Sequence, residues 1–294
     1  MGPLRHRAAR RQHRGRDDRG ARRIGRTCRR RSPVTRPATA DHRTPLVPGV
    51  LDEHQPAQGS AAGWPLVLYF HHVHPDVRHY TALTPTSFAA GLEAVLARFT
   101  PLDPRSFGRE AVPRPEEPSV LITFDDGYRD NHDIARAILR DVGVRAVFFA
   151  CTGLLGQRSA HAREDYMSLT ECDALVDDGH VVAAHTRTHP HLDRIDPGRV
   201  QDEALGSIED IARRYGPAAA RLFAYPYGGI PERIDLPDGT LAFGSVRSPA
   251  TPWTDHPQSI RRTYLPSGHQ LLWPDLIDRW HRDWKLDDGA EGSR

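Results

Sequence analysis

The stretch Ser119-Val120-Leu121-Ile122-Thr123-Phe124-Asp125-Asp126-Gly127 is an apolar, β-branched run that ends abruptly in two carboxylates and a glycine. The run predicts a short buried β-strand, and Gly127 predicts a tight turn directly after it. Asp125 and Asp126 are therefore expected at the carboxyl end of a buried strand. In α/β folds, functional sites are usually built at that end of the sheet.

A second motif, His185-Thr186-Arg187-Thr188-His189, places two imidazoles four positions apart after the apolar strand 181–184. One aspartate and two histidines can converge on a divalent metal, which leaves the other aspartate free to act as a base. Each motif alone also has a plainer interpretation. Asp125 could cap the next helix after a polar turn, and the histidines could be surface groups.

A third motif, Arg221-Leu222-Phe223-Ala224-Tyr225-Pro226-Tyr227-Gly228-Gly229, is an apolar strand that runs into a Pro-aromatic-Gly turn. The three motifs in this order resemble the polysaccharide deacetylases, the carbohydrate esterase family 4 proteins that share the NodB homology domain. The resemblance covers roughly residues 64 to 270, and three ordered motifs are more specific than any one of them. It implies a metal-dependent hydrolase that removes N-acetyl groups from sugars.

The resemblance also implies a role for each motif residue. Asp126, His185 and His189 match the metal ligands, and Asp125 matches the general base that takes a proton from the attacking water. Zinc is the expected metal, with cobalt, nickel or manganese as alternatives, because one carboxylate and two imidazoles discriminate weakly among these ions. The family stabilises the oxyanion with a backbone N–H, here that of Tyr227. Pro226 and Gly228 are expected to shape this turn.

Two features of the family pattern are not found at their usual places. Family members often carry an arginine before the Pro-Tyr-Gly element that orients the base, whereas Ala224-Tyr225 stands there, so the partner of Asp125 stays open. The late histidine that acts as general acid is also not evident, and His269 is a weak alternative.

An apolar run over residues 65–70 ends in His71-His72 and resembles the opening strand of the poly-N-acetylglucosamine deacetylase branch. In that branch an early histidine is the general acid. The role is therefore carried to His71, with His72 as the alternative. An imidazole suits this task because its pKa lies near neutrality.

The order of the predicted elements indicates the fold class. Strands at 145–150 and 181–184 alternate with helical patterns at 131–142, 169–178 and 199–215, which predicts a parallel sheet. By resemblance this becomes a single α/β domain, an irregular and incompletely closed (β/α)7-type barrel. A helix at 85–99 is expected to pack over it, residues 236–264 to form loops with one or two short strands, and 271–284 to form a closing amphipathic helix.

Charge divides the chain unequally. Residues 1–43 hold 15 Arg and 3 Asp, a charge of +12, so the rest of the chain carries 2 − 12 = −10. This composition predicts a disordered basic tail and linker over residues 1–60, with the catalytic domain over 61–290. Nucleic-acid binding would rest on the tail alone and is not the expected function. An unpatterned Arg-rich leader is also what a misassigned start in a high-GC gene would give.

The location of the protein stays open at this point. Residues 1–60 contain no apolar stretch typical of a signal peptide, and no run in the chain approaches the ~18 apolar residues of a membrane span. The resemblance, by contrast, implies a secreted or cell-surface enzyme that acts on an N-acetylated glycan, with N-acetylglucosamine polymers first. The oligomeric state stays open, with a monomer favoured. A deacylase of a small glycoside or another amide, and a non-catalytic glycan-binding protein on the same scaffold, are the alternatives.

Overall fold

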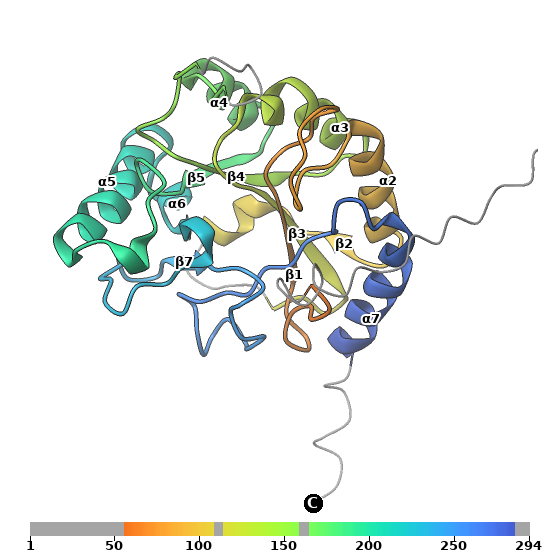
Figure 1. The fold of residues 1–294 in the computed structure, drawn as a ribbon. Coiled ribbons are helices and arrows are strands. Elements are labelled where there is room, and N and C mark those ends of the chain that lie inside the picture. The colour runs from red at the N-terminus through yellow and green to blue at the C-terminus, as the bar shows by residue number, and fades with distance from the viewer. Residues whose placement is uncertain (1–55, 109–113, 159–164, 286–294) are drawn as a thin grey trace, which may run out of the picture. The chain divides into compact units, whose positions relative to one another are not determined.

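The computed structural model describes residues 56–108, 114–158 and 165–285 (Figure 1). The predicted tail and linker therefore lie outside the described residues, except for 56–60. A sheet of seven parallel strands has the order β1-β3-β4-β5-β6-β7, with β2 beside β3. The strands are β1 (Leu66–Phe70), β2 (Thr100–Pro101), β3 (Ser119–Phe124), β4 (Ala146–Ala150), β5 (Val181–Ala184), β6 (Leu222–Ala224) and β7 (Leu241–Phe243). The parallel α/β sheet confirms the predicted fold class.

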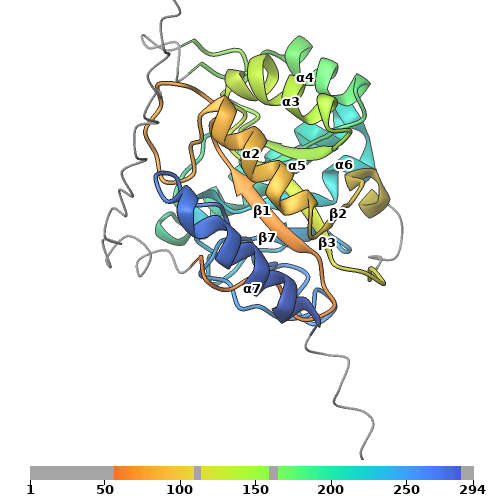
Figure 2. The same cartoon turned by 90° about the vertical axis from the view of Figure 1, so that its right-hand side faces the viewer.

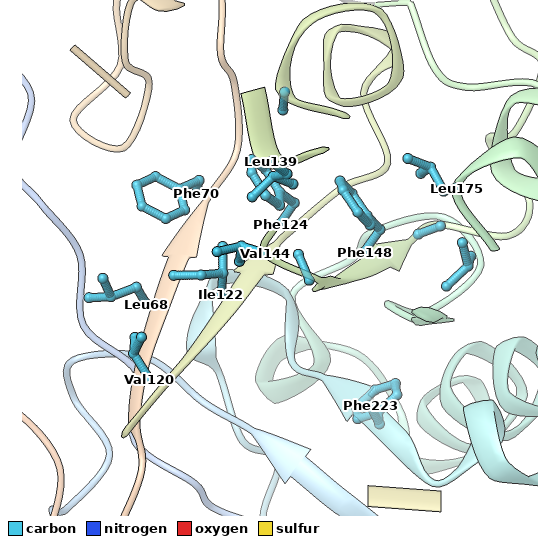
Figure 3. Close-up of a cluster of buried hydrophobic side chains, with 14 of the residues drawn as sticks. Leu68, Phe70, Val120, Ile122, Phe124, Leu139, Val144, Phe148, Leu175 and Phe223 are labelled. Carbon is cyan, nitrogen blue, oxygen red and sulfur yellow. The ribbon is translucent and has the colours of Figure 1, made fainter. Parts of the chain in front are cut away.

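Apart from the short exposed strand β2, the strands are largely buried on both faces, as expected for a parallel sheet, and successive side chains belong to different cores. Leu68 and Phe70 on β1 lie with Ile122 and Phe124 on β3, on the side that faces Leu139 of α3 (Figure 3). The residues between them form a second core on the opposite face of the sheet, with members such as Val67, Leu121, Val147, Phe149 and Phe243. The same alternation continues into the residues that follow the strands, and it determines which of their side chains point to the inside of the barrel at the carboxyl end of the sheet.

The helices cover the core that contains Leu68 and Phe70. They are α2 (Pro85–Leu96), α3 (Arg136–Asp141), α4 (Leu169–Asp177), α5 (Pro197–Tyr215), α6 (Pro217–Ala220) and α7 (Trp273–Lys285). Helices α2 and α7 lie side by side over β1 (Figure 2), and α7 buries Trp273, Trp280 and Trp284 against the domain. The helices expected at 85–99, 169–178, 199–215 and 271–284 are confirmed within a few residues. None of the helices in the described part of the chain combines the length and apolar character that crossing a bilayer requires.

Residues 257–264 connect the two edges of the sheet. The Ile260 N–H donates to the Ala242 carbonyl at 2.9 Å, and the Thr263 N–H donates to the Val67 carbonyl at 2.8 Å. The segment thus pairs with β7 on one side and with β1 on the other through isolated bridges, which leaves the barrel irregular. Arg262 lies between these two bridging residues, a position that matters for the site.

His180 is a buried structural group whose protonation state affects stability. It is 4% exposed, and its Nδ1 accepts a hydrogen bond from the Ala146 N–H at 3.0 Å. Burial lowers the pKa of His180 to about 4, from 6.5 in an unfolded chain. The unfolded state therefore binds more protons than the folded state between these two pH values. The free energy of unfolding is highest above pH ~6.5 and falls by up to about 3 kcal/mol as the pH drops toward 4.

We therefore expect His180→Asn, whose amide oxygen can still accept a hydrogen bond, to be less sensitive to acid than the wild type. Urea unfolding at about pH 7 and about pH 4.5 should show a smaller loss of unfolding free energy for the variant. An equal loss in both proteins would show that His180 does not titrate in this window.

Candidate metal and catalytic site

The carboxyl ends of four parallel strands lead into the residues that the sequence singled out. His71 follows β1, Asp125 and Asp126 follow β3, His185 follows β5, and the turn Pro226–Gly228 follows β6. Parallel strands present their carboxyl ends at one edge, so four motifs that are distant in sequence meet there. The structure therefore brings the three predicted motifs and the early histidine together.

Asp126 lies between the two motif histidines. Its Oδ1 is 3.0 Å from His189 Nε2 and 3.3 Å from His185 Nε2. The candidate ligand atoms of the three residues all lie within 4.8 Å of one another. Burial raises the pKa of Asp126, but the imidazoles of His71, His185 and His189 outweigh this effect and hold its pKa well below the usual value. The carboxylate is therefore ionised.

The donor set fits a divalent metal. His185 Nδ1 donates to the carbonyl oxygen of Ala224 at 2.8 Å, so its neutral tautomer turns the lone pair of Nε2 toward Asp126. Asp126 Oδ1 is buried and has no hydrogen-bond partner among the described residues. His185 Nε2 and the Asp126 oxygen that it faces can both bind a cation, and one oxygen with two nitrogens is a set that zinc and related metals accept.

The backbone of the site adopts an uncommon conformation. Apart from glycines, four of the described residues have a positive φ: Asp126 at 71°, Thr186 at 63°, His189 at 59° and Tyr227 at 59°. All four belong to the site motifs. Each such residue costs on the order of 1–3 kcal/mol, and such strain persists only where the surroundings hold it. Thr186 Oγ1, for example, accepts the backbone N–H of His189 at 3.0 Å.

Asp125 is held by Arg262 in a two-pronged ion pair. Arg262 NH1 donates to Oδ1 at 2.6 Å and NH2 donates to Oδ2 at 2.7 Å, with the two residues 2% and 3% exposed. The guanidinium also donates to the Gly244 carbonyl at 2.7 Å and lies 4.9 Å from the centre of the Tyr69 ring. Burial raises the pKa of Asp125, but the charge of Arg262 outweighs it and the net shift is downward. Arg262 thus occupies the role left open for the partner of the base.

His71 and His72 point in opposite directions. His71 continues the alternation that turns Tyr69 inward, and its Nε2 lies 3.9 Å from Asp126 Oδ2. Its Nδ1 shares a hydrogen bond of 2.8 Å with Thr81 Oγ1. His72 Nδ1 instead lies 2.7 Å from Asp130 Oδ2, and its ring stacks on Tyr128 with centroids 3.8 Å apart. The geometry therefore favours His71 over His72 as general acid, and His269 lies away from these motifs, before the 3-10 turn Gln270–Leu272.

Comparison with known proteins shows which family the chain resembles. A family model described as polysaccharide deacetylase matches residues 113–237, which contain the Asp125, His185 and Tyr227 motifs. This part of the chain is similar to the polysaccharide deacetylase family. The match ends before Arg262, so the closing segment of the chain lies outside the matched region.

Curated relatives match part of the chain. The Bacillus subtilis (strain 168) protein YxkH, which its name places among polysaccharide deacetylases, is 33% identical over 115 residues, 39% of each chain. A chitooligosaccharide deacetylase of Bradyrhizobium sp. (strain ANU 289) is 33% identical over 112 residues, 37% of this chain and 46% of the relative. The matches thus span less than half the length of either curated relative.

A solved structure has a similar fold. The Streptococcus pyogenes deacetylase PplD, in complex with acetate, superposes with a TM-score of 0.58 at 19% identity. The superposition covers 74% of this chain and 97% of PplD. The predicted fold class is therefore confirmed by both topology and likeness.

Two cavities meet at this site. A small one of about 60 Å³ is lined by Asp125, Arg262, Tyr69 and Val246, among others. A larger one of about 610 Å³ reaches Asp126 and His189. His71, Tyr80 and Tyr227 line both. The ring of Tyr227 is 54% exposed and stacks on His191, with centroids 3.7 Å apart.

Arg262 is the residue that sequence reasoning missed. It is separated from Asp125 by 137 positions and falls in the stretch 236–264, which was expected to be mostly loop. One signal was available in Ile260-Arg261-Arg262-Thr263-Tyr264, where arginines sit inside a short β-like run. Such a run predicts that an arginine will be buried, and a buried arginine needs a carboxylate or carbonyl partner.

The two adjacent histidines can be distinguished by substitution. We expect His71→Ala to lower kcat by about 10²-fold or more, because the imidazole that lies 3.9 Å from Asp126 would no longer supply a proton. His72→Ala removes the contact with Asp130 and should mainly reduce stability. Acetate release measured per folded molecule separates the effects, and a larger loss of kcat in His72→Ala would reverse the assignment.

Proposed function

We propose that the protein is a metal-dependent hydrolase that removes N-acetyl groups from N-acetylated sugars of a polysaccharide. Glycans that contain N-acetylglucosamine are the first candidates, and residues 61–290 form the catalytic domain. The observation that carries this proposal is the pair of neighbouring carboxylates with different surroundings. Asp126 faces two imidazoles, whereas Asp125 is held by Arg262. A scaffold that only held a metal would not need the second carboxylate.

Asp126, His185 and His189 are the residues that would hold the metal, with zinc as the first choice and cobalt, nickel or manganese as substitutes. A divalent cation bound there supplies Lewis-acid polarisation of the acetyl carbonyl and of the attacking water. Adjacent carboxylates normally raise each other's pKa. Here Arg262 balances the charge of Asp125, and the bound metal would balance the charge of Asp126. That separation allows one to serve as ligand and the other as base.

The proposed chemistry of the protein side chains follows from these positions. Asp125 takes a proton from the water that attacks the acetyl carbon, and Arg262 keeps both of its carboxylate oxygens in place. The backbone N–H of Tyr227, in the strained turn after β6, donates to the oxygen that gains negative charge. His71 gives a proton to the sugar nitrogen as the C–N bond breaks. Acetate and the free amine are the products.

The dimensions of the two cavities support an acetylated sugar as the substrate. The cavity of about 60 Å³ beside Asp125 is much smaller than its neighbour of about 610 Å³, so it suits a short acyl group such as acetyl. The cavity of about 610 Å³ lies within the range of ~300–1,000 Å³ that is usual for small-molecule sites. It has room for one or a few sugar rings.

The known relatives support the same substrate class. One is named as a chitooligosaccharide deacetylase, and PplD was solved with acetate. A polymeric glycan substrate implies that the enzyme acts outside the cell or at its surface, and we propose this location for the protein. We also propose that it acts as a monomer. Deacylation of a small glycoside uses the same residues and is the nearest alternative.

N-acetylglucosamine oligomers and their N-propionyl counterparts test the proposal. We expect acetate release at a rate at least about tenfold above propionate release, because one additional methylene must fit the small cavity. Equal rates would contradict the assignment of that cavity to the acyl group. Binding of the oligomers without release of either acid would favour a glycan-binding protein.

A further inference from the structure

Glu203, on helix α5, holds the loop that carries the two candidate metal-binding histidines. Its carboxylate is 7% exposed. One oxygen, Oε2, accepts the backbone N–H groups of Arg187 at 3.0 Å and Thr188 at 2.8 Å. The other, Oε1, accepts the hydroxyl of Thr188 at 2.5 Å. A buried acidic side chain thus binds the two residues at the centre of the His185–His189 loop.

The same face of α5 is shaped around Arg187. At Gly206 a Cβ would lie 2.3 Å from the Arg187 guanidinium carbon, so only glycine leaves space for that side chain in its present position. Asp202 and Asp210 bind the guanidinium at 2.9 and 3.2 Å. The helix therefore binds this loop through a buried carboxylate and two ion pairs, and Gly206 leaves the space that the Arg187 side chain occupies.

The opposite side of the loop is fixed as well. The Thr152 N–H donates to the Thr186 carbonyl at 3.1 Å, and the Gly153 N–H donates to the Arg187 carbonyl at 2.9 Å. Backbone N–H donors from the segment after β4 and side-chain carboxylates on α5 thus hold the loop between them. Only Glu203 among these partners accepts two consecutive N–H groups of the loop.

This restraint acts on a strained backbone. Thr186 and His189 have φ values of 63° and 59°, and they flank the two residues that Glu203 binds. Hydrogen bonds to a charged group are among the stronger ones in proteins, so the three that Glu203 accepts can hold the backbone in this uncommon conformation. Without Glu203 the loop would relax, and His189 would leave the position facing Asp126.

We propose that Glu203 is a positioning residue that preorganises His185 and His189 for metal binding before the metal arrives. The inference rests on the proposed metal binding by Asp126, His185 and His189. In its absence, part of the free energy of metal binding would be spent on reshaping the loop, which lowers affinity. Outer partners of metal ligands typically change affinity by about 10- to 100-fold.

The test measures zinc affinity of metal-stripped protein by competition with a chromogenic chelator, on variants whose fold is verified by circular dichroism. We expect Glu203→Gln, which keeps the size but removes the charge and one of the two acceptor oxygens, to weaken zinc binding about 10- to 100-fold. Glu209→Gln, which removes the same charge from an exposed position of the same helix, should bind as the wild type does. Thr188→Val removes only the hydroxyl bond and should weaken binding a few-fold.

The outcomes separate this inference from the proposed function. Wild-type affinity in every folded variant at Glu203 and Thr188 would overturn the inference while leaving the metal site intact. The same holds if these variants lower only the melting temperature of the metal-free protein, as a merely structural role would. A wild-type protein that binds no zinc, or binds it equally after His189→Ala, would instead overturn the proposed metal site.

Discussion

Replacing Asp125 by asparagine is expected to lower kcat for acetate release by about 10³-fold, because an amide of nearly the same shape cannot accept the proton of the attacking water. Zinc binding should persist in this variant, since Asp125 is not among the three clustered candidate ligands. Acetate release and bound zinc are measured on the same sample.

Asp126→Asn is the matched control for that result. It changes the neighbouring carboxylate in the same way, but it should lose zinc affinity together with activity because Asp126 lies between the two imidazoles. If Asp125→Asn kept activity within tenfold of the wild type, Asp125 would not be the base. If it lost zinc as Asp126→Asn does, the division of roles between the two carboxylates would be wrong.

Replacing Arg262 by methionine is expected to lower the unfolding free energy by about 3–5 kcal/mol, because it leaves the Asp125 carboxylate buried without its partner. Activity should fall as well, since the two carboxylate oxygens would no longer be fixed. Urea unfolding gives the stability, and Arg247→Met, an exposed arginine that lines the small cavity, is the control.

A double-mutant cycle makes the second prediction specific. In Arg262→Met combined with Asp125→Asn, the uncompensated charge is gone, so the double variant should be more stable than the sum of the two single effects implies. Strictly additive losses would show that the two side chains contribute to stability independently of one another. The cycle thus measures the ion pair itself rather than the packing of the arginine.

The strand that opens the first motif could be predicted from sequence because its information is local. The β-branched run at Ser119–Phe124 forms β3 within these same bounds, and the carboxylates follow it as expected. Since neighbouring parallel strands present the same end to one edge, the order of the motifs was enough to bring Asp126, His185 and His189 together. Local pattern and topology therefore accounted for the candidate metal ligands.

The remaining parts of the site depend on contacts that no local pattern contains. Arg262 reaches Asp125 because residues 257–264 pair with both β7 and β1, which is a tertiary choice. Glu203 looks like any acidic helix residue until α5 packs against the loop. The helix expected at 131–142 begins with a π-helical turn, Asn131–Ala135, where the Asn131 amide donates to the His71 carbonyl at 2.8 Å.

The choice between His71 and His72 is an intermediate case. Side chains alternate along β1, so Val67 and Tyr69 predict that the next residue in the series, His71, turns to the same side. This alternation could be read from the sequence, but the sequence does not say which face of β1 is turned toward the site. The structure shows that it is the face of Tyr69, whose ring lies beside Arg262.

Acetate release from N-acetylglucosamine oligomers, by protein first stripped of metal and then reloaded with zinc, tests the central claim most directly. The account predicts that release stops on stripping, returns on reloading, and stays absent in zinc-loaded Asp125→Asn. Tight zinc binding by the wild-type protein without acetate release from any oligomer offered would contradict it.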